Sequence, residues 1–215
     1  MRRLLLALVM CSSLPASAHA APGIEAAVAA YESGDLVKAR SAFTRLARNG
    51  VPAAEYNLAV MHLRGELPRP DPREALRLMT HAAEAGFVTG IYGLAQMHEL
   101  GQGGLKVDLV EANRWYQRAA EAGSVDGQVA IGTAHYLGRG APKDPALAAR
   151  WFRIAAQGGD VGAMYLYASM LESGDGIPRD LNEARYWYGA AARNGDEAAP
   201  SKLKELDAKL GAPTT

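Results

Sequence analysis

Apolar residues recur at intervals of three and four along most of the chain, which is the spacing of one face of an α-helix. This pattern is itself periodic, because the motif Ala-Ala-x-x-Gly returns with its glycines 37, 36 and 36 residues apart. The four glycines are Gly86, Gly123, Gly159 and Gly195. A fixed period of this length predicts a helical repeat protein in which each unit buries its apolar face against the next.

Each period contains the signals for two helices. The second helix is expected to begin at an aspartate, whose carboxylate accepts hydrogen bonds from the free backbone N–H groups of the first turn. It ends at the glycine, because glycine readily adopts the left-handed conformation of a helix C-terminus. The aspartates are Asp71, Asp108, Asp144 and Asp180. The first helix ends at a second series of glycines, namely Gly65, Gly101, Gly138 and Gly174.

Packing positions keep the same period. In the second helices, Trp115, Trp151 and Trp187 recur, and each is followed by another aromatic residue, so we expect these side chains in the core. In the first helices, a large residue followed by a small one lets neighbouring helices approach closely. These pairs are Leu58-Ala59, Leu94-Ala95, Ile131-Gly132 and Tyr167-Ala168.

The period divides the chain into four repeat units with a helical segment at each end. The units are expected at residues 51–86, 87–123, 124–159 and 160–195. Residues 21–50 are expected to form an N-terminal capping helix pair. Residues 196–215 are expected to form a C-terminal capping helix and tail, whose polar outer face keeps the end of the stack soluble.

Residues 1–20 have the composition of a cleaved secretory signal peptide. A positively charged start and the apolar run Leu4–Met10 precede Ala18-His19-Ala20, so we expect cleavage after Ala20. The apolar run is too short for a permanent anchor, and no later segment approaches the ~18 apolar residues that a spanning helix needs. The mature protein is therefore expected in the periplasm, without membrane insertion.

The only cysteine, Cys11, lies in this signal, so the mature chain is expected to have no disulfide and no cysteine metal site. Lipid attachment at Cys11 is not favoured, because Met10 stands where lipoprotein signals have a small residue. Secretion beyond the periplasm is a further alternative of lower rank. The formal net charge is zero, so the chain has no basic excess to neutralise phosphates, and nucleic acid is not an expected partner.

The combined pattern resembles the Sel-one-like repeat, a relative of the tetratricopeptide repeat. Each unit matches in the large–small pair, the glycine after the first helix, the aspartate, an alanine four residues later, and Ala-Ala-x-x-Gly. The resemblance implies an all-α fold, a right-handed α-solenoid of antiparallel helix pairs, and a role as an adaptor for another protein. A cysteine-rich branch linked to penicillin binding or hydrolysis is a poor match, because the mature chain lacks its paired cysteines.

Three histidines, His62, His98 and His135, occupy equivalent places in successive units. Imidazoles are zinc ligands, but adjacent helices alone lie ~8–10 Å apart, whereas the ligands of one ion lie ~2 Å from it. We therefore interpret the histidines as packing residues, with a mild pH sensitivity as an open alternative. No metal and no other cofactor is expected.

Catalytic motifs are not found in the sequence. The chain lacks the hydrolase, metalloprotease and nucleotide-binding motifs, and no Ser or Cys is placed beside a base. His98-Glu99 is not followed by the second histidine of a metalloprotease motif. No catalytic residue is predicted, and we expect that the protein is not an enzyme; a site assembled from distant residues is the alternative.

The first helices provide the predicted binding groove, by resemblance to tetratricopeptide grooves. Its positions lie two before, two after and five after the first residue of each large–small pair, and their residue types vary between units. Variation of this kind indicates either contact with a partner or simple solvent exposure. The positions are Tyr56, Val60, Leu63, Tyr92, Gln96, Glu99, Val129, Thr133, Tyr136, Tyr165, Ser169 and Glu172.

The sequence therefore favours a non-catalytic adaptor of the bacterial envelope that binds a peptide or protein in a concave groove. Two alternatives stay open: a periplasmic regulator of a membrane sensor or secretion component, and an enzyme that acts on the cell wall or binds penicillin. The identity of the partner, the pathway and the oligomeric state do not follow from the sequence.

Overall fold

The computed structural model describes residues 23–211, and within them all regular secondary structure is α-helical. This confirms the predicted all-α class. The predicted cleavage site after Ala20 lies outside the described residues. The helices are α1 (Ile24–Glu32), α2 (Leu36–Arg48), α3 (Pro52–Arg64), α4 (Pro72–Glu84), α5 (Val88–Leu100), α6 (Leu109–Glu121), α7 (Val125–Leu137), α8 (Pro145–Gln157), α9 (Val161–Ser173), α10 (Leu181–Arg193) and α11 (Ala199–Leu210).

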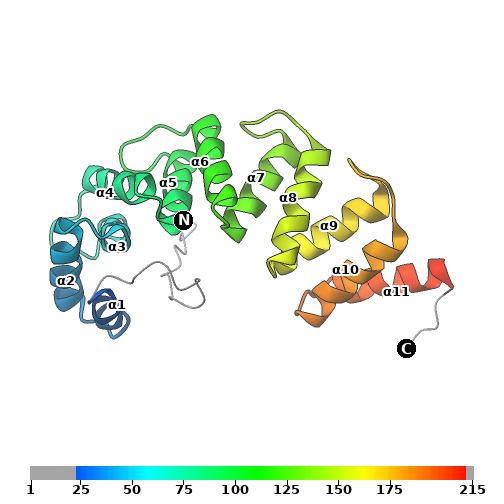
Figure 1. Cartoon of the computed structure of the whole chain (residues 1–215), viewed down its shortest axis with the longest axis horizontal. Helices are drawn as coiled ribbons and strands as arrows, with labels where there is room; N and C mark the ends of the chain where they lie inside the picture. Colours follow the sequence, from blue (N-terminus) through cyan, green and yellow to red (C-terminus); the bar gives the residue numbers. More distant parts are fainter. Residues whose placement is uncertain (1–22, 212–215) are drawn as a thin grey trace. The chain divides into compact units, whose positions relative to one another are not determined.

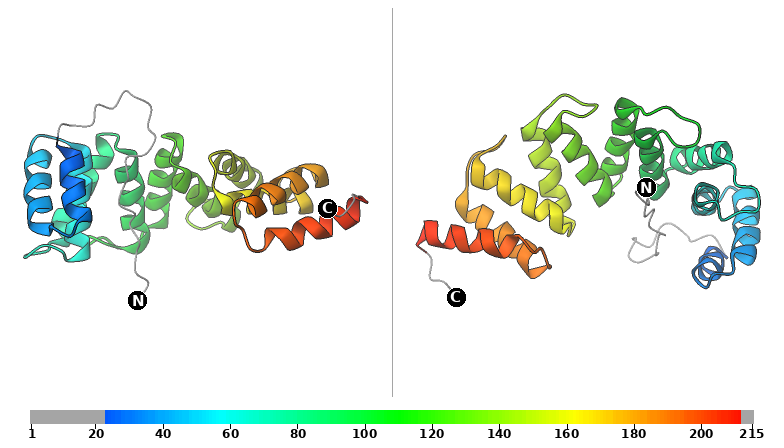
Figure 2. Two further views of the ribbon diagram at one scale, coloured as in Figure 1. Left: turned by 90° about the horizontal axis from the view of Figure 1, so that it is seen from below. Right: turned by 180° about the vertical axis from the view of Figure 1, so that it is seen from behind.

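Successive helices pack against each other within two compact units. One unit ends at Trp115 and the other begins at Tyr116, so the division falls inside α6. In the first unit α1 to α5 are neighbours in chain order, and in the second α7 to α11 are (Figure 1, Figure 2). Each unit therefore has the consecutive helix-pair packing of a repeat protein.

The second helices begin at the predicted aspartates. Asp71 Oδ1 accepts a hydrogen bond from Arg73 N at 2.9 Å, and Asp144 Oδ1 accepts one from Leu147 N at 2.9 Å. After α4, Gly86 has a φ of 81°, the left-handed conformation that the Ala-Ala-x-x-Gly motif predicts. These signals act within a few residues, and they define the bounds of the second helices without long-range contacts.

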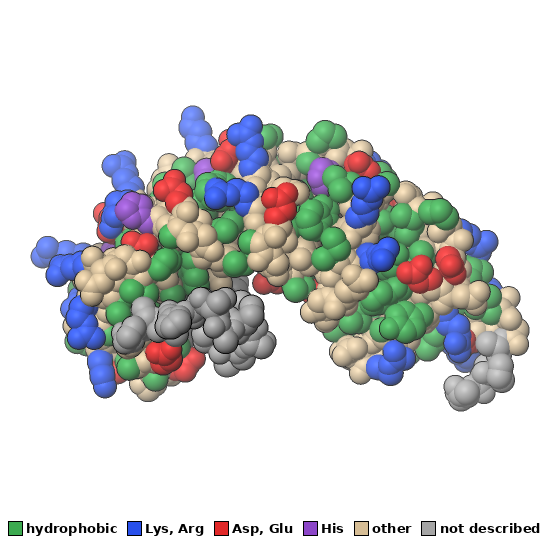
Figure 3. All heavy atoms as spheres, in the orientation of Figure 1, with side chains coloured by type: hydrophobic (Ala, Val, Ile, Leu, Met, Phe, Trp, Pro, Cys, Tyr) green, Lys and Arg blue, Asp and Glu red, His purple; other side chains and the backbone are tan. Residues whose placement is uncertain are grey.

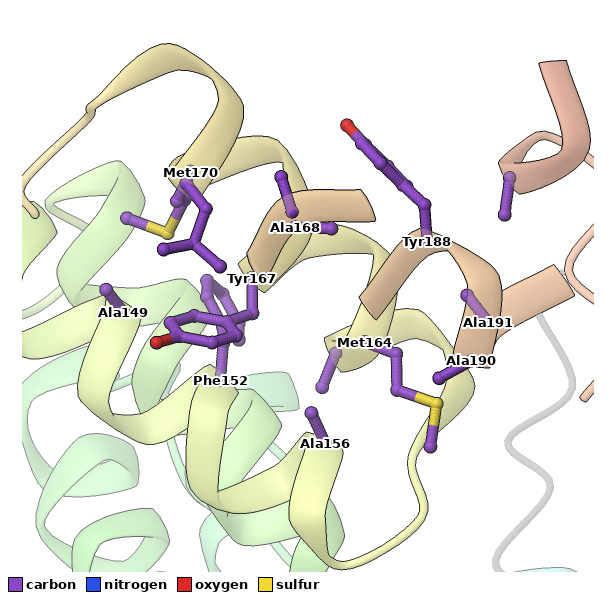
Figure 4. Packing of buried hydrophobic residues seen from close by; sticks show 14 of the residues in the cluster. Ala149, Phe152, Ala156, Met164, Tyr167, Ala168, Met170, Tyr188, Ala190 and Ala191 are labelled. Atoms are coloured by element: carbon purple, nitrogen blue, oxygen red, sulfur yellow. The ribbon is translucent and has the colours of Figure 1, made fainter. Parts of the chain in front are cut away.

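The core of the second unit shows how the repeats pack (Figure 4). Phe152 of α8 is 2% exposed and Tyr188 of α10 is 0% exposed, and both follow a recurring tryptophan. Small side chains between them bring α8, α9 and α10 close together; the labelled examples are Ala149, Ala156, Ala168, Ala190 and Ala191. The aromatic residue after each tryptophan therefore anchors the core.

The tryptophans themselves are only half-buried, so their assignment to the core was partly wrong. Trp187 lies between Tyr167 and Tyr186, with ring centroids 5.8 and 5.2 Å away. Its Nε1 donates a hydrogen bond to Glu183 Oε1 at 3.3 Å. Trp187 lies at the edge of the core, because its indole packs against Tyr167 of α9 and remains partly exposed to solvent.

Candidate functional site

In the first unit, Tyr56 and Val60 do not lie on a binding surface. They are 1% and 2% exposed, and the ring of Tyr56 packs against Phe87 at a centroid distance of 5.6 Å. Burial raises the pKa of Tyr56 to about 12. A Cβ added at Gly93 of α5 would lie 3.4 Å from the Tyr56 ring, which shows how closely α5 covers this side chain. Both residues are core residues, in contrast to the groove prediction.

The remaining predicted positions of the first unit, Leu63, Tyr92, Gln96 and Glu99, are half-buried. The last three share one face of α5, because they are separated by four and three residues. Gln96 Oε1 is buried and accepts no hydrogen bond from the described residues. This α5 face therefore combines an aromatic, an amide and an acidic side chain, all partly accessible.

In the second unit, the predicted position Thr133 bonds within α7, whereas Tyr136 contacts neighbouring elements. Thr133 Oγ1 donates to the carbonyl of Val129 on its own helix at 2.8 Å. The ring of Tyr136 packs edge-on against Phe152 at 6.5 Å. A hydrogen bond to Asp175, together with burial, raises the pKa of the Tyr136 hydroxyl. Thr133 and Tyr136 stay half-buried, with part of their surface accessible.

On α9 the predicted positions contact the following helices. Glu172 accepts hydrogen bonds from Tyr188 of α10 at 3.1 Å and from Lys209 of α11 at 2.9 Å, and Lys202 Nζ lies 3.6 Å away. The bond from Lys209 is the main reason that the pKa of Glu172 is lowered. Glu172 therefore joins three helices.

Tyr165 and Ser169 border the same contact. Tyr165 packs edge-on against Tyr188 at 5.2 Å, and Ser169 hydrogen-bonds to the Tyr188 hydroxyl. The sequence does not reveal this arrangement, because it predicts only a polar outer face for the C-terminal capping helix. The alternation of lysines with glutamate and aspartate on α11 gives no sign of which lysines turn toward α9.

Two of the three histidines, His62 and His135, contact the loop that follows their own helix. His62 Nδ1 accepts a hydrogen bond from Asp71 N at 3.0 Å, and His135 Nδ1 lies 3.2 Å from the carbonyl oxygen of Pro142. Burial lowers the pKa of His62 below its usual value. Among residues 23–211, no group of three or more His, Cys, Asp and Glu side chains is arranged to hold a metal ion. Through these contacts, His62 and His135 hold the loop that connects the two helices of their repeat.

Comparison with known proteins gives the family. The Sel1 repeat pattern matches residues 52–87, 88–124, 125–160 and 161–196, each range starting one residue after a predicted unit. A search of the curated proteins found no match. The chain belongs to the Sel1 repeat family, whose members are generally adaptors for protein–protein interactions.

Two solved structures are similar. One is a protective antigen from uropathogenic Escherichia coli strains with an SLR fold, at 28% identity and a TM-score of 0.78, covering 83% of this chain and 38% of that one. The other is a Sel1 repeat protein from Oxalobacter formigenes, at 35% identity and a TM-score of 0.75, covering 79% of this chain and 49% of that one. This chain therefore matches less than half the length of each of the two solved proteins.

The structure also bears on the membrane. Every helix between residues 23 and 211 is too short or too polar to cross a bilayer.

Proposed function

We propose that this protein is a non-catalytic adaptor of the bacterial envelope, which binds a peptide or protein partner through the faces of its first helices. The observation that carries the proposal is the α5 face, where Tyr92, Gln96 and Glu99 are partly accessible and the Gln96 position has a different residue in every repeat. The recurring alanines of the same repeats are fully buried and keep their type, namely Ala75, Ala112, Ala148 and Ala184. Variable accessible side chains on a fixed frame are how repeat proteins achieve selective binding.

The aromatic and amide groups of this face are suited to peptide recognition. Tyrosine combines a large apolar ring with a hydrogen-bonding hydroxyl, and such residues are enriched among the anchors of protein interfaces. Gln96 is half-buried between Tyr92 and Glu99 on this face, so part of its polar side chain is accessible to a peptide. Family membership supports the same class of function.

The test is capture of envelope proteins after cross-linking, with the mature protein as bait. The variant Tyr92→Ala/Gln96→Ala should lose at least about tenfold of the captured partner, the effect of removing an interface anchor. The matched control is Tyr186→Ala/Gln157→Ala, which removes the same residue types from exposed places on α10 and α8. Equal capture by both variants, with both folded by circular dichroism, would contradict the α5 face as the site.

The envelope location is tested separately. Fractionation of cells that produce the full chain is expected to place the mature protein in the periplasmic fraction. Its first residue should be Ala21, as determined by N-terminal sequencing. An intact amino terminus in the cytoplasmic fraction would exclude an envelope adaptor and leave the interaction surface itself untouched.

A further inference from the structure

We propose that the outer face of α2 is a second binding surface, which takes an acidic, carboxylate-rich segment of a protein partner. The surface is a hollow of about 430 Å³, called here the α2 hollow. It is lined by Arg40, Ser41, Thr44, Arg45, Arg48 and Asn49. The inference rests on the proposed function only in taking the ligand to be protein, since the α2 hollow and the α5 face are different surfaces.

Within residues 23–211, the arginines of the α2 hollow have no acidic partner. Among the described residues, no carboxylate lies within ion-pair distance of Arg40, Arg45 or Arg48. By contrast, Arg77 of α4 and Arg114 of α6 each pair with a glutamate three residues earlier, at 2.6 and 3.0 Å. The guanidinium groups of the α2 hollow therefore keep their hydrogen-bond donors for an external anion.

The charge of α2 also departs from that of α4, α6 and α10, although α8 likewise has no acidic residue and carries two arginines. Residues 36–48 contain one lysine, three arginines and no acidic residue. Lys38 stands where the later second helices have Glu74, Glu111 and Glu183. Arg48 stands where α4 and α6 end in Glu84 and Glu121, whereas α10 ends in Arg193 at this position.

A helix dipole explains only part of this pattern. Basic residues in the last turn interact favourably with the partial negative charge of the helix C-terminus, which accounts for Arg45 and Arg48. It does not account for Lys38 in the first turn, where an acidic residue is favoured. Residues 36–48, which follow the capping Asp35, therefore carry charges of one sign, and Figure 3 shows basic side chains along the edge where α2 lies.

The lining favours carboxylates on a protein over a lipid surface. A guanidinium presents a planar pair of donors that matches a carboxylate, and the Ser41 and Thr44 hydroxyls and the Asn49 amide add further donors. A helix that lies on a bilayer also needs an apolar face. On α2 the only exposed large apolar side chain is Val37, which is 72% exposed.

The test measures binding of a fluorescent oligo-glutamate peptide to the mature protein at low ionic strength, with oligo-glutamine of the same length as the reference. Wild type is expected to bind oligo-glutamate in preference, with binding weakened by added salt. The variant Arg40→Gln/Arg45→Gln/Arg48→Gln should weaken it by about tenfold or more, each tenfold being ~1.4 kcal/mol. The control Arg77→Gln/Arg114→Gln/Arg150→Gln removes the same charge from exposed positions on α4, α6 and α8 and should change it by less than about threefold.

Three results would overturn the inference. The first is equal binding of oligo-glutamate and oligo-glutamine by wild type, and the second is equal weakening in both triple variants. The third is binding of vesicles that contain anionic phospholipid, abolished by the α2 substitutions, without binding of oligo-glutamate. Because the probe is a defined peptide, none of these results depends on whether the α5 face captures an envelope protein, so the two proposals fail separately.

Discussion

A single hydrogen bond makes the stability of the first unit sensitive to pH. His62 Nδ1 accepts from Asp71 N at the start of α4, so this nitrogen must be unprotonated. Burial lowers the folded-state pKa of His62 below the usual 6.5. The contribution is therefore fully present above about pH 6.5 and is lost as the pH falls toward and through the folded-state pKa. Urea unfolding across pH 5–7 should show about 1 kcal/mol less stability at the acid end.

The test of this prediction compares substitution of His62 with substitution of His135, its equivalent in a later repeat. In His62→Gln, the difference in the free energy of unfolding between pH 7 and pH 5 should shrink by about 1 kcal/mol. In His135→Gln the loss of stability toward acid pH that comes from His62 should remain, because the contact between His62 and Asp71 is intact and His135 contacts a carbonyl oxygen instead of a backbone N–H. A larger change in His135→Gln than in His62→Gln would contradict the role assigned to the Asp71 contact.

Glu172 provides a second test at the residue scale. Its carboxylate accepts from Tyr188 and Lys209, and its side chain is 15% exposed. We expect Glu172→Gln to lower the free energy of unfolding by about 1–2 kcal/mol at pH 7, because it weakens charge-assisted hydrogen bonds. Since its pKa is lowered, the contribution of Glu172 is present above about pH 4.5 and is lost as the pH falls through the folded-state pKa.

Lys202 supplies the comparison, because it pairs with both Glu172 and the more exposed Glu205, whose side chain is 56% exposed. Glu205→Gln should change stability by less than about 0.5 kcal/mol, as expected for a surface ion pair. Thermal unfolding of both variants at pH 7 and pH 3 distinguishes them. A loss in Glu172→Gln that is the same at both pH values would exclude the ionised carboxylate as its cause.

At the scale of helices, the same substitution is expected to have opposite effects at two glycines. A Cβ at Gly127 of α7 would lie 2.8 Å from the backbone nitrogen of Ala120, which cannot move aside. Gly127→Ala should therefore destabilise by about 1–3 kcal/mol, through overpacking between α6 and α7. At Gly189 of α10, the nearest atom is the mobile end of Arg193 at 3.3 Å, so Gly189→Ala should stabilise by about 0.5–1 kcal/mol through helix propensity. Chemical denaturation measures both, and a stable Gly127→Ala would show that the helices separate easily.

The helices also show why some features were predictable from the sequence. Helix bounds follow from local signals such as Asp144 and Gly86, so the two-helix repeat was predicted correctly. Burial of the first-helix positions depends on residues far along the chain. Tyr56 is covered by Phe87 and by the glycine-containing α5, which a fixed offset from Leu58 does not reveal.

The candidate site was also predictable only in part, because its positions follow from the repeat but its long-range contacts do not. The α5 positions follow from the repeat register alone, whereas Glu172 was assigned to the groove without any sign that Lys209 would reach it. The arginines of α2 were also missed, because the formal net charge of the chain is zero and conceals a local excess. The charge of each helix taken separately distinguishes α2, which has no acidic residue, from α4, α6 and α10.

At the scale of the whole molecule, contacts between successive helices predict that a local defect stays local. Packing in each unit runs from one helix to the next in chain order, which makes stability a sum of nearest-neighbour terms. Leu206 of α11 and Phe43 of α2 are both 0% exposed, near opposite ends of the described residues. Leu206→Ala is expected to cost about 2–5 kcal/mol and Phe43→Ala about 3–5 kcal/mol, each in its own unit.

Native-state hydrogen exchange reads these losses helix by helix. Leu206→Ala should lower the protection of α10 and α11 most and that of α9 less, while α2 to α4 keep wild-type protection. Phe43→Ala should give the converse, with the loss concentrated in α1 to α3. Each variant is the control for the other, because both remove a buried apolar side chain. If either variant lowers protection evenly from α1 to α11, the molecule unfolds as one cooperative body, and nearest-neighbour contacts along the chain do not limit the spread of a defect.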